Sequence, residues 1–417
     1  MRVLMVSWEY PPVVIGGLGR HVHALARELA AAGHEVVVLS RHPAGTDAET
    51  HPTDDQTAGG VRVLRVAEDP AHMEFARDMM AWTLAMGHAM VRAALTRLGR
   101  WRPDVVHAHD WLVAHPSIAL ADVLGAPLVA TIHATEAGRW GGWLSSPVSR
   151  QVHSTEWWLT NRADTVITCS AAMRAEVAEL FDLDPDPIAV LHNGIEPRGW
   201  RVPRARVRAA RQHHAPDGAP LLLYFGRLEY EKGVQDLIAA LPRIRRAHRG
   251  TRLLVAGTGT GAEMLVGAAR THRVRRSVDF LGHLPDGDLA PLLAAADAVV
   301  LPSRYEPFGI VALEAAAAGA PLVSSTAGGL GDIVVDGRTG ASFAPGDVAG
   351  LARAVGDVLA DPAAARRRAR AARARLEVEF DWVHIAAATA EVYARTPTGG
   401  PQDLPRPKIP TGNVFGR

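Results

Sequence analysis

Short apolar runs alternate with longer amphipathic stretches along most of the chain. The first apolar run, Arg2–Ser7, leads into a loop that carries Gly16 and Gly17. Leu18–Ala32 then has apolar residues at helical spacing, and Glu35–Ser40 is the next apolar run. This order predicts a strand, a glycine-containing loop, a helix and a second strand, which together make one βαβ unit.

The alternation continues in two series that a polar, proline-containing stretch separates. Strands of the first series are expected at Val61–Val66, Val105–His109, Leu128–His133, Thr165–Cys169 and Ala189–Leu191, and those of the second at Leu221–Phe225, Arg252–Ala256, Val278–Leu281, Ala298–Leu301 and Pro321–Ser324. Runs that are apolar throughout suit parallel sheets covered on both faces. The fold class predicted is α/β, with two Rossmann-like domains facing across a cleft.

The domain boundaries are predicted from a change in composition near residue 195, where the chain becomes polar and rich in proline. Residues 1–196 form the expected N-terminal domain and residues 197–380 the C-terminal domain, with Pro197–Pro220 read as a linker and a short connecting helix. Two helices are expected near the end, at Asp361–Arg375 and Asp381–Arg395. Residues 396–417 are rich in Pro and Gly without an apolar period, which predicts a disordered tail.

Composition and charge are those of a globular enzyme. Hydrophobic residues make up 48% of the 417 residues, charged residues 21%, and the net charge of +1 gives no reason to expect nucleic acid as a partner.

Cys169, the one cysteine, is expected to be buried. Met79–Leu95 reads as a packed helix, with an in-plane membrane helix as the alternative. No secretory signal is visible, so a cytoplasmic protein is expected.

The most informative motif follows the expected strand Ala298–Leu301. It reads Tyr305-Glu306-Pro307-Phe308-Gly309, with Glu314 eight residues after Glu306. A helix beginning at Pro307 would leave the amides of Gly309, Ile310 and Val311 at its N-terminus, where they can bind an anion. Glu306 would lie at this site, and Glu314 could accept hydrogen bonds from a ribose.

These two carboxylates have two alternative interpretations. The pair that hydrolyses a glycosidic bond stands ~5 Å or ~6.5–9.5 Å apart. Eight helical residues rise ~12 Å, so Glu306 and Glu314 suit that chemistry poorly. The second interpretation is purely structural, with Glu306 near a helix cap and Glu314 on the surface.

Two cations follow the expected strand Leu221–Phe225, in the segment 226–233, GRLEYEKG. Arg227 offers a planar fork to a phosphate and Lys232 a point charge on a flexible stem. Both would stabilise a departing nucleotide diphosphate. The alternative is that they pair with Glu229 and Glu231 on the surface.

Polar residues also end the strands of the first half. His107, His109 and Asp110 could suggest a metal, but two histidines at period two share one strand face while Asp110 points away. His107 is therefore expected in the core, and Asp110 and His133 are expected to reach the substrate. Asn193 closes the first half, where it could equally be part of a turn.

Glycine-rich segments add weaker signals. Gly16 and Gly17 would let backbone approach a ligand at a helix start. Gly257-x-Gly259-x-Gly261 lacks the acidic residue of a dinucleotide fingerprint, so it is not interpreted as an NAD site.

These motifs, in this order, resemble the retaining GT-B glycosyltransferases of family four, and the likeness extends from Arg2 to about Arg395. Glu306 and Glu314 match that family's E-x7-E motif, and Arg227 with Lys232 matches its diphosphate pair. The stretch from Ser7 to His21 is similar to actinobacterial α-1,4-glucosyltransferases acting on glycogen-like glucan and methylglucose polysaccharide.

The resemblance implies a role for each matching residue. Gly17, Arg227 and Lys232 would bind the diphosphate, Glu306 the donor sugar and Glu314 the ribose. His133 would lie near the anomeric carbon, Asp110 near the acceptor, and Asn193 would shape the cleft. The donor-binding set carried over consists of Gly17, Arg227, Lys232, Glu306, Phe308, Gly309, Ile310, Val311 and Glu314.

The resemblance also implies what accompanies the reaction. The donor would be UDP-glucose or ADP-glucose, the acceptor an α-1,4-glucan or related sugar, the configuration retained, and neither a cofactor nor a metal needed. The helix Asp381–Arg395 would cross back onto the first domain. Bacterial glycogen synthases carry K-x-G-G-L-x-D where this chain has Val14 and Arg20, which favours family four over that subgroup.

Other functions remain open on the sequence. One is a transferase of mannosyl or another hexosyl unit to a lipid or small molecule. A phosphorylase, a sugar-nucleotide epimerase and a sugar-sensing binding module share the same fold class. Membrane contact is not expected, and the sequence does not indicate the oligomeric state.

Overall fold

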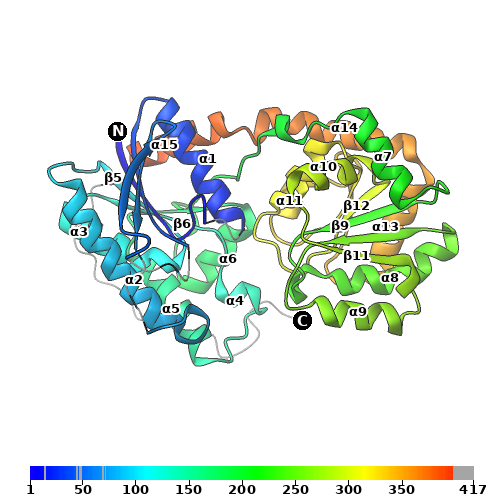
Figure 1. Cartoon of the computed structure of the whole chain (residues 1–417), viewed down its shortest axis with the longest axis horizontal. Coiled ribbons are helices and arrows are strands. Elements are labelled where there is room, and N and C mark those ends of the chain that lie inside the picture. The colour runs from blue at the N-terminus through cyan, green and yellow to red at the C-terminus, as the bar shows by residue number, and fades with distance from the viewer. Residues whose placement is uncertain (14–15, 44–45, 47–48, 68–69, 71, 398–417) are drawn as a thin grey trace. The chain divides into compact units, whose positions relative to one another are not determined.

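The structure, a computed structural model, describes residues 1–397 apart from 14–15, 44–45, 47–48, 68–69 and 71. The chain divides into two compact units (Figure 1). Met1–Asn193 and the segment from Trp382 form the first unit, and Gly194–Asp381 forms the second. Val14 and residues 398–417 of the expected tail lie outside the described residues.

The first unit is built on an eight-stranded sheet in the order β3-β4-β2-β1-β5-β6-β7-β8. Its strands are β1 (Arg2–Ser7), β2 (Glu35–Arg41), β3 (Asp54–Ala58), β4 (Val61–Val66), β5 (Val105–His109), β6 (Leu128–Ile132), β7 (Thr165–Thr168) and β8 (Ala189–Val190). All neighbours are parallel except β3 and β4, which pair antiparallel.

The helices of this unit connect and cover those strands. They are α1 (Gly17–Ala31), α2 (Phe75–Leu98), the 3-10 turn η1 (Trp111–Val113), α3 (Ala114–Leu124), α4 (Glu136–Arg139), α5 (Pro147–Arg162), α6 (Ala171–Phe181) and α15 (Trp382–Arg395). Val22 and Leu25 of α1 pack with Val3 and Met5 of β1 in the core, and Tyr393 of α15 joins the same cluster.

The second unit is built on a six-stranded, all-parallel sheet in the order β11-β10-β9-β12-β13-β14. Its strands are β9 (Leu221–Phe225), β10 (Arg252–Ala256), β11 (Val278–Gly282), β12 (Ala298–Leu301), β13 (Leu322–Ser325) and β14 (Ala341–Phe343). The two α/β units, whose sheets are parallel apart from the edge strand β3, confirm the predicted α/β fold class.

Figure 1 shows β9 and β12 in the middle of this unit, with α8 and α9 on one side and α10 and α11 on the other. The helical segments are η2 (Pro197–Trp200), α7 (Arg204–His214), η3 (Tyr230–Lys232), α8 (Val234–Ala247), α9 (Ala262–Thr271), η4 (Arg275–Ser277), α10 (Asp286–Ala295), α11 (Ile310–Ala318), α12 (Leu330–Ile333), α13 (Val348–Ala360) and α14 (Pro362–Glu379).

Residues 197–220 contain η2 and the expected connecting helix, α7, which packs on α10 of the second unit. The Arg211 guanidinium lies 2.7 Å from the carboxylate of Asp297 and also donates to the carbonyl of Ala295 at 3.1 Å. The polar sequence reflects an exposed helix that is held by charge and hydrogen bonds rather than by apolar burial.

Two expectations about burial are confirmed. Cys169 is 1% exposed. The Met-rich segment lies within α2, where Met86 and Met90 are fully buried. In the part of the chain that the structure describes, no helix combines the length and the apolar character needed to cross a bilayer.

Candidate functional site

In the second unit, two loops meet at the carboxyl edge of the sheet. Because β9 and β12 are parallel neighbours, the loops that follow them start side by side. Lys232 Nζ, after β9, lies 2.9 Å from Oε2 of Glu306, after β12. Both side chains are nearly enclosed, at 13% and 11% exposure, and Ser303 Oγ donates to the same oxygen at 3.2 Å. Two motifs that are 74 residues apart thus form one charged pair.

Arg227 is held differently from Lys232. Its guanidinium lies 3.1 Å from the carboxylate of Glu231, four residues later, and half of its side chain is exposed. The alternative of surface ion pairing therefore applies to Arg227 but not to Lys232. An ion pair with an exposed partner contributes only about 0–1 kcal/mol to the stability of the fold. An anion can therefore replace Glu231 as the partner of Arg227 with little loss of stability.

The loop that carries Arg227 rests on the glycine-rich segment after β10. A Cβ on Gly257 would lie 1.8 Å from the carbonyl oxygen of Gly226, so a side chain has no room there. Leu228 donates its amide to the Thr258 carbonyl at 2.8 Å and accepts from the Gly261 amide at 2.8 Å. These glycines let two backbones pack closely, a role that the sequence pattern did not indicate.

The helix after β12 begins later than predicted. α11 starts at Ile310 and not at Pro307, because Gly309 has a φ of +105°, which a right-handed helix does not allow. The carbonyl of Glu306 instead accepts from the amide of Gly329 at 3.0 Å. Glu306 therefore precedes the helix, and the ~12 Å helical spacing from Glu314 does not apply.

The three amides predicted to bind an anion lie at the start of α11. Ala312 donates its amide to the carbonyl of Gly309 at 2.8 Å, whereas the amides of Gly309, Ile310 and Val311 are at the open end of the helix. Glu314 is 7% exposed, so the interpretation of this residue as a surface glutamate is wrong. Phe308, also buried, packs near Phe380 within the same unit.

In the first unit, α1 begins at Gly17, and Gly17 is exposed. The amide of Gly16, one residue earlier, donates to Oε2 of Glu9 at 3.1 Å. This contact ties the glycine pair to the loop after β1. The N-terminus of α1 thus follows a carboxyl-edge loop, as the βαβ prediction required.

His107 is a core residue, as expected. It is fully buried, its Nδ1 lies 2.7 Å from the hydroxyl of Tyr393, and its Nε2 lies 2.7 Å from the hydroxyl of Thr131. Both ring nitrogens are thereby occupied within the protein, so His107 has none left for a metal or a substrate.

Asp110 organises the ends of β5 and β6. Its backbone has a φ of +65°, and its Oδ1 accepts the amide of His133 at 2.7 Å. Burial raises the pKa of Asp110 to about 6, against the hydrogen bond from His133 and the charge of Arg139, which lower it. The geometry thus joins the two residues that were expected to reach the substrate.

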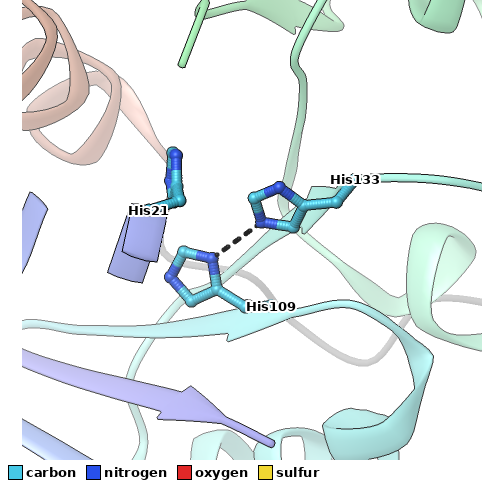
Figure 2. A group of neighbouring side chains, drawn as sticks. All are labelled: His21, His109 and His133. Atoms are coloured by element: carbon cyan, nitrogen blue, oxygen red, sulfur yellow. Dashed lines mark hydrogen bonds between the residues drawn. The ribbon is translucent and has the colours of Figure 1, made fainter. Parts of the chain in front are cut away.

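Three histidines gather beside this point (Figure 2). His109 Nδ1 lies 3.2 Å from His133 Nε2, and the rings of His21 and His133 are 4.8 Å apart between centroids. Burial lowers the pKa of all three, that of His133 to about 3, so the imidazoles are neutral near pH 7. Asn193, which is 4% exposed, is near enough to His21 to oppose this lowering of its pKa.

This histidine group is the arrangement that could hold a metal ion. Within the described ranges, His21, His109 and His133 each offer a ligand atom, and these atoms lie within 4.8 Å of one another. Neutral imidazole is a ligand for Zn²⁺ at ~2.0–2.1 Å, so the ligand atoms would have to draw closer together. The sequence pattern pointed to His107, His109 and Asp110 instead. It gave no sign of His21, because that residue lies on a helix about ninety residues before His109.

Two family profiles match the chain. The one described as "Glycosyl transferases group 1" matches residues 206–375, and "Glycosyltransferase Family 4" matches residues 15–198. The glycogen synthase of Mycobacterium tuberculosis is 60% identical over 415 residues, which cover 98% of both chains.

Two further proteins are similar over nearly their whole length. The alpha-maltose-1-phosphate synthase of Mycobacterium tuberculosis is 33% identical over 416 residues, covering 95% of this chain and 99% of its own. The structure of the sucrose-phosphate synthase from Thermosynechococcus elongatus superposes with a TM-score of 0.79 at 25% identity, covering 94% of this chain and 98% of the other.

Proposed function

The chain belongs to the family 4 glycosyltransferases, and on that premise we propose that it transfers a glucosyl unit from UDP-glucose or ADP-glucose to an α-1,4-glucan or a related polysaccharide. The 60% identity to a glycogen synthase supports a glucan acceptor. The observation that carries the proposal is the contact between Lys232 and Glu306 beside the start of α11.

This contact suits a donor that carries both phosphate and sugar. In the proposal, Lys232 and Arg227 bind the diphosphate, together with the amides of Gly309, Ile310 and Val311. Glu306, held by Lys232, accepts hydrogen bonds from the sugar hydroxyls, and Glu314 binds the ribose. Positive groups held in place before the reaction stabilise the charge that grows on the leaving diphosphate.

The proposed step breaks the bond between the anomeric carbon and the phosphate oxygen. The acceptor hydroxyl oxygen bonds to that carbon on the same face, and its proton passes to the departing phosphate oxygen, so the α configuration is retained. Neutral His133 would lie near the anomeric carbon, and its low pKa keeps a second cation away from that carbon.

The first unit would contribute the remaining groups. We assign Gly17 at the start of α1 to the diphosphate, Asp110 to the acceptor and Asn193 to the shape of the site. In this assignment the first unit binds the acceptor and contributes Gly17 and His133 to the donor, and the second unit provides the other donor contacts. Neither a cofactor nor a metal is part of the proposed reaction.

The decisive experiment is a product analysis with the purified chain. UDP-glucose, ADP-glucose and GDP-mannose are each incubated with maltooligosaccharides and with lipid acceptors, and the products are read by mass spectrometry and anomeric NMR couplings. We expect glucosyl extension of maltooligosaccharides with α linkage. Mannosyl transfer or a lipid product would favour the alternative hexosyltransferase, and β-linked product would contradict retention.

Removing metal ions is expected to leave the activity unchanged. The proposed groups supply all the charge stabilisation, so EDTA treatment should not lower kcat. The same assay with added Zn²⁺ is the control, because a metal bound at His21, His109 and His133 would occupy His133 and inhibit. A large loss on EDTA that Zn²⁺ restores would mean that the histidine group holds a working metal.

The acid side of the pH profile is expected to follow Asp110. Its pKa is raised to about 6, so the carboxylate is charged above this pH and protonated below it. A protonated carboxyl holds the His133 amide and an acceptor hydroxyl less strongly, so kcat/KM for the acceptor should fall as the pH drops through about 6. Asp110→Asn should be less active and lack this acid limb. A limb that persists in the variant would assign it to another group.

A further inference from the structure

Two tryptophans lie exposed on the loop after α4. The segment Trp140-Gly141-Gly142-Trp143 leaves Trp140 63% and Trp143 60% exposed. The chain has ten tryptophans, and the other eight are all buried or partly buried. Isolated exposed apolar residues are ordinary, but a pair of the largest side chains on one short loop is not.

The loop is built to hold these rings outward. Glu136 Oε1 accepts from the indole Nε1 of Trp140 at 3.0 Å and from Ser149 Oγ at 2.6 Å. The amide of Gly142 donates to the Ala137 carbonyl at 2.7 Å, and that of Trp143 donates to the Trp140 carbonyl at 3.2 Å. These hydrogen bonds hold the loop backbone and the Trp140 ring in place.

The loop is also continuous with the predicted acceptor residues. α4 begins three residues after His133, at the carboxyl edge of the first sheet. Arg139, which precedes Trp140, is close enough to Asp110 for its charge to lower the pKa of that carboxyl. A polymer that reacts beside Asp110 can therefore extend over this loop.

We propose that Trp140 and Trp143 form a binding subsite for the distal sugars of an α-glucan acceptor. Flat indole faces match the apolar C–H faces of pyranose rings, and the exposed Arg139 offers hydrogen bonds to their hydroxyls. A rigid aromatic surface also costs little conformational entropy on binding. This subsite rests on the proposed glucan acceptor, and it adds preference for a long chain over a short one.

The test compares long and short acceptors in matched variants. In the Trp140→Ala/Trp143→Ala double variant, the KM for maltoheptaose or glycogen should rise roughly tenfold, whereas kcat, the KM for the donor and the KM for maltose stay unchanged. Trp140→Phe should keep most of the affinity, but Trp140→Leu should lose it, because leucine is apolar without being flat. Val123→Ala, at a residue of α3 that is 63% exposed, is the control for removing surface apolar area.

A binding measurement separates this inference from the proposed function. Calorimetry without donor should show that maltoheptaose binds the wild-type chain and that the double variant binds roughly tenfold more weakly, while cellohexaose binds neither. If maltooligosaccharides are acceptors but the double variant keeps its KM, the subsite is wrong and the function stands. If no α-glucan binds or reacts, both are wrong. A wild-type dimer that the double variant abolishes would assign the tryptophans to self-association and overturn the subsite.

Discussion

Replacing Lys232 with alanine is expected to lower kcat by about 10²–10³-fold, the loss typical of removing one preorganised group that stabilises developing charge. Lys232 lies 2.9 Å from Glu306 in a nearly enclosed position, so no water-exposed cation can take its place at once. The effect should fall mainly on kcat, since the charge that Lys232 stabilises grows as the diphosphate departs. Steady-state kinetics with saturating donor measures it.

Two further variants show what the lysine contributes. Lys232→Arg keeps the charge but places a larger planar group against Glu306, and we expect it to recover only part of the rate. Arg227→Ala should cost less than Lys232→Ala, because Arg227 is half exposed and already shares its charge with Glu231. Near-wild-type rates in both alanine variants would refute the phosphate assignment. Thermal unfolding of each variant separates this effect from the loss of a partly buried ion pair.

Replacing Glu306 with alanine is expected to spare nucleotide binding and to lower the rate of sugar transfer by about 10²-fold, in the range for a lost transition-state contact. Glu306 is assigned to the sugar hydroxyls, and the nucleotide contacts lie with other groups. Calorimetry with UDP or ADP and kinetics with the sugar nucleotide distinguish these two outcomes.

The matched controls are Glu306→Gln and Glu231→Ala. Glutamine keeps the shape and one acceptor oxygen but loses the charge that faces Lys232, so it should be intermediate. The Glu231 carboxylate pairs with half-exposed Arg227 at 3.1 Å, and its loss should change the rate little. Unchanged kinetics in Glu306→Ala would mean that the donor sugar lies elsewhere.

Much of the fold could be read from the apolar pattern because parallel strands are buried on both faces. β1, β4, β5, β9 and β12 have the predicted bounds. β3, Asp54–Ala58, escaped notice because it is an edge strand with four exposed residues, which needs hydrogen bonds to β4 but no apolar burial. The sequence predicted that α11 starts at Pro307, because proline is common at the first position of a helix. The left-handed conformation of Gly309 prevents a helix from running through that residue, so α11 starts at Ile310.

The sequence indicated which residues follow strands but not which of them meet. The pair of Lys232 and Glu306 depends on β9 lying next to β12, and that order across the sheet is a property of the whole domain. The same holds for His21, which reaches His109 and His133 because α1 packs over β1. A sequence motif identifies the residues of a single loop. A site is formed by residues from several loops, and the order of the strands in the sheet decides which loops are neighbours.

The lysine at the centre of this pair has a practical consequence. The sequence contains 43 arginines but only two lysines, Lys232 and Lys408. Amine-selective reagents such as acyl esters, or formaldehyde with a hydride donor, therefore have few targets besides the α-amino group. Reductive methylation with ¹³C-formaldehyde would therefore give a simple NMR spectrum. The resonance that is missing in Lys232→Ala belongs to the Nζ of Lys232, and its chemical shift would report on nucleotide binding.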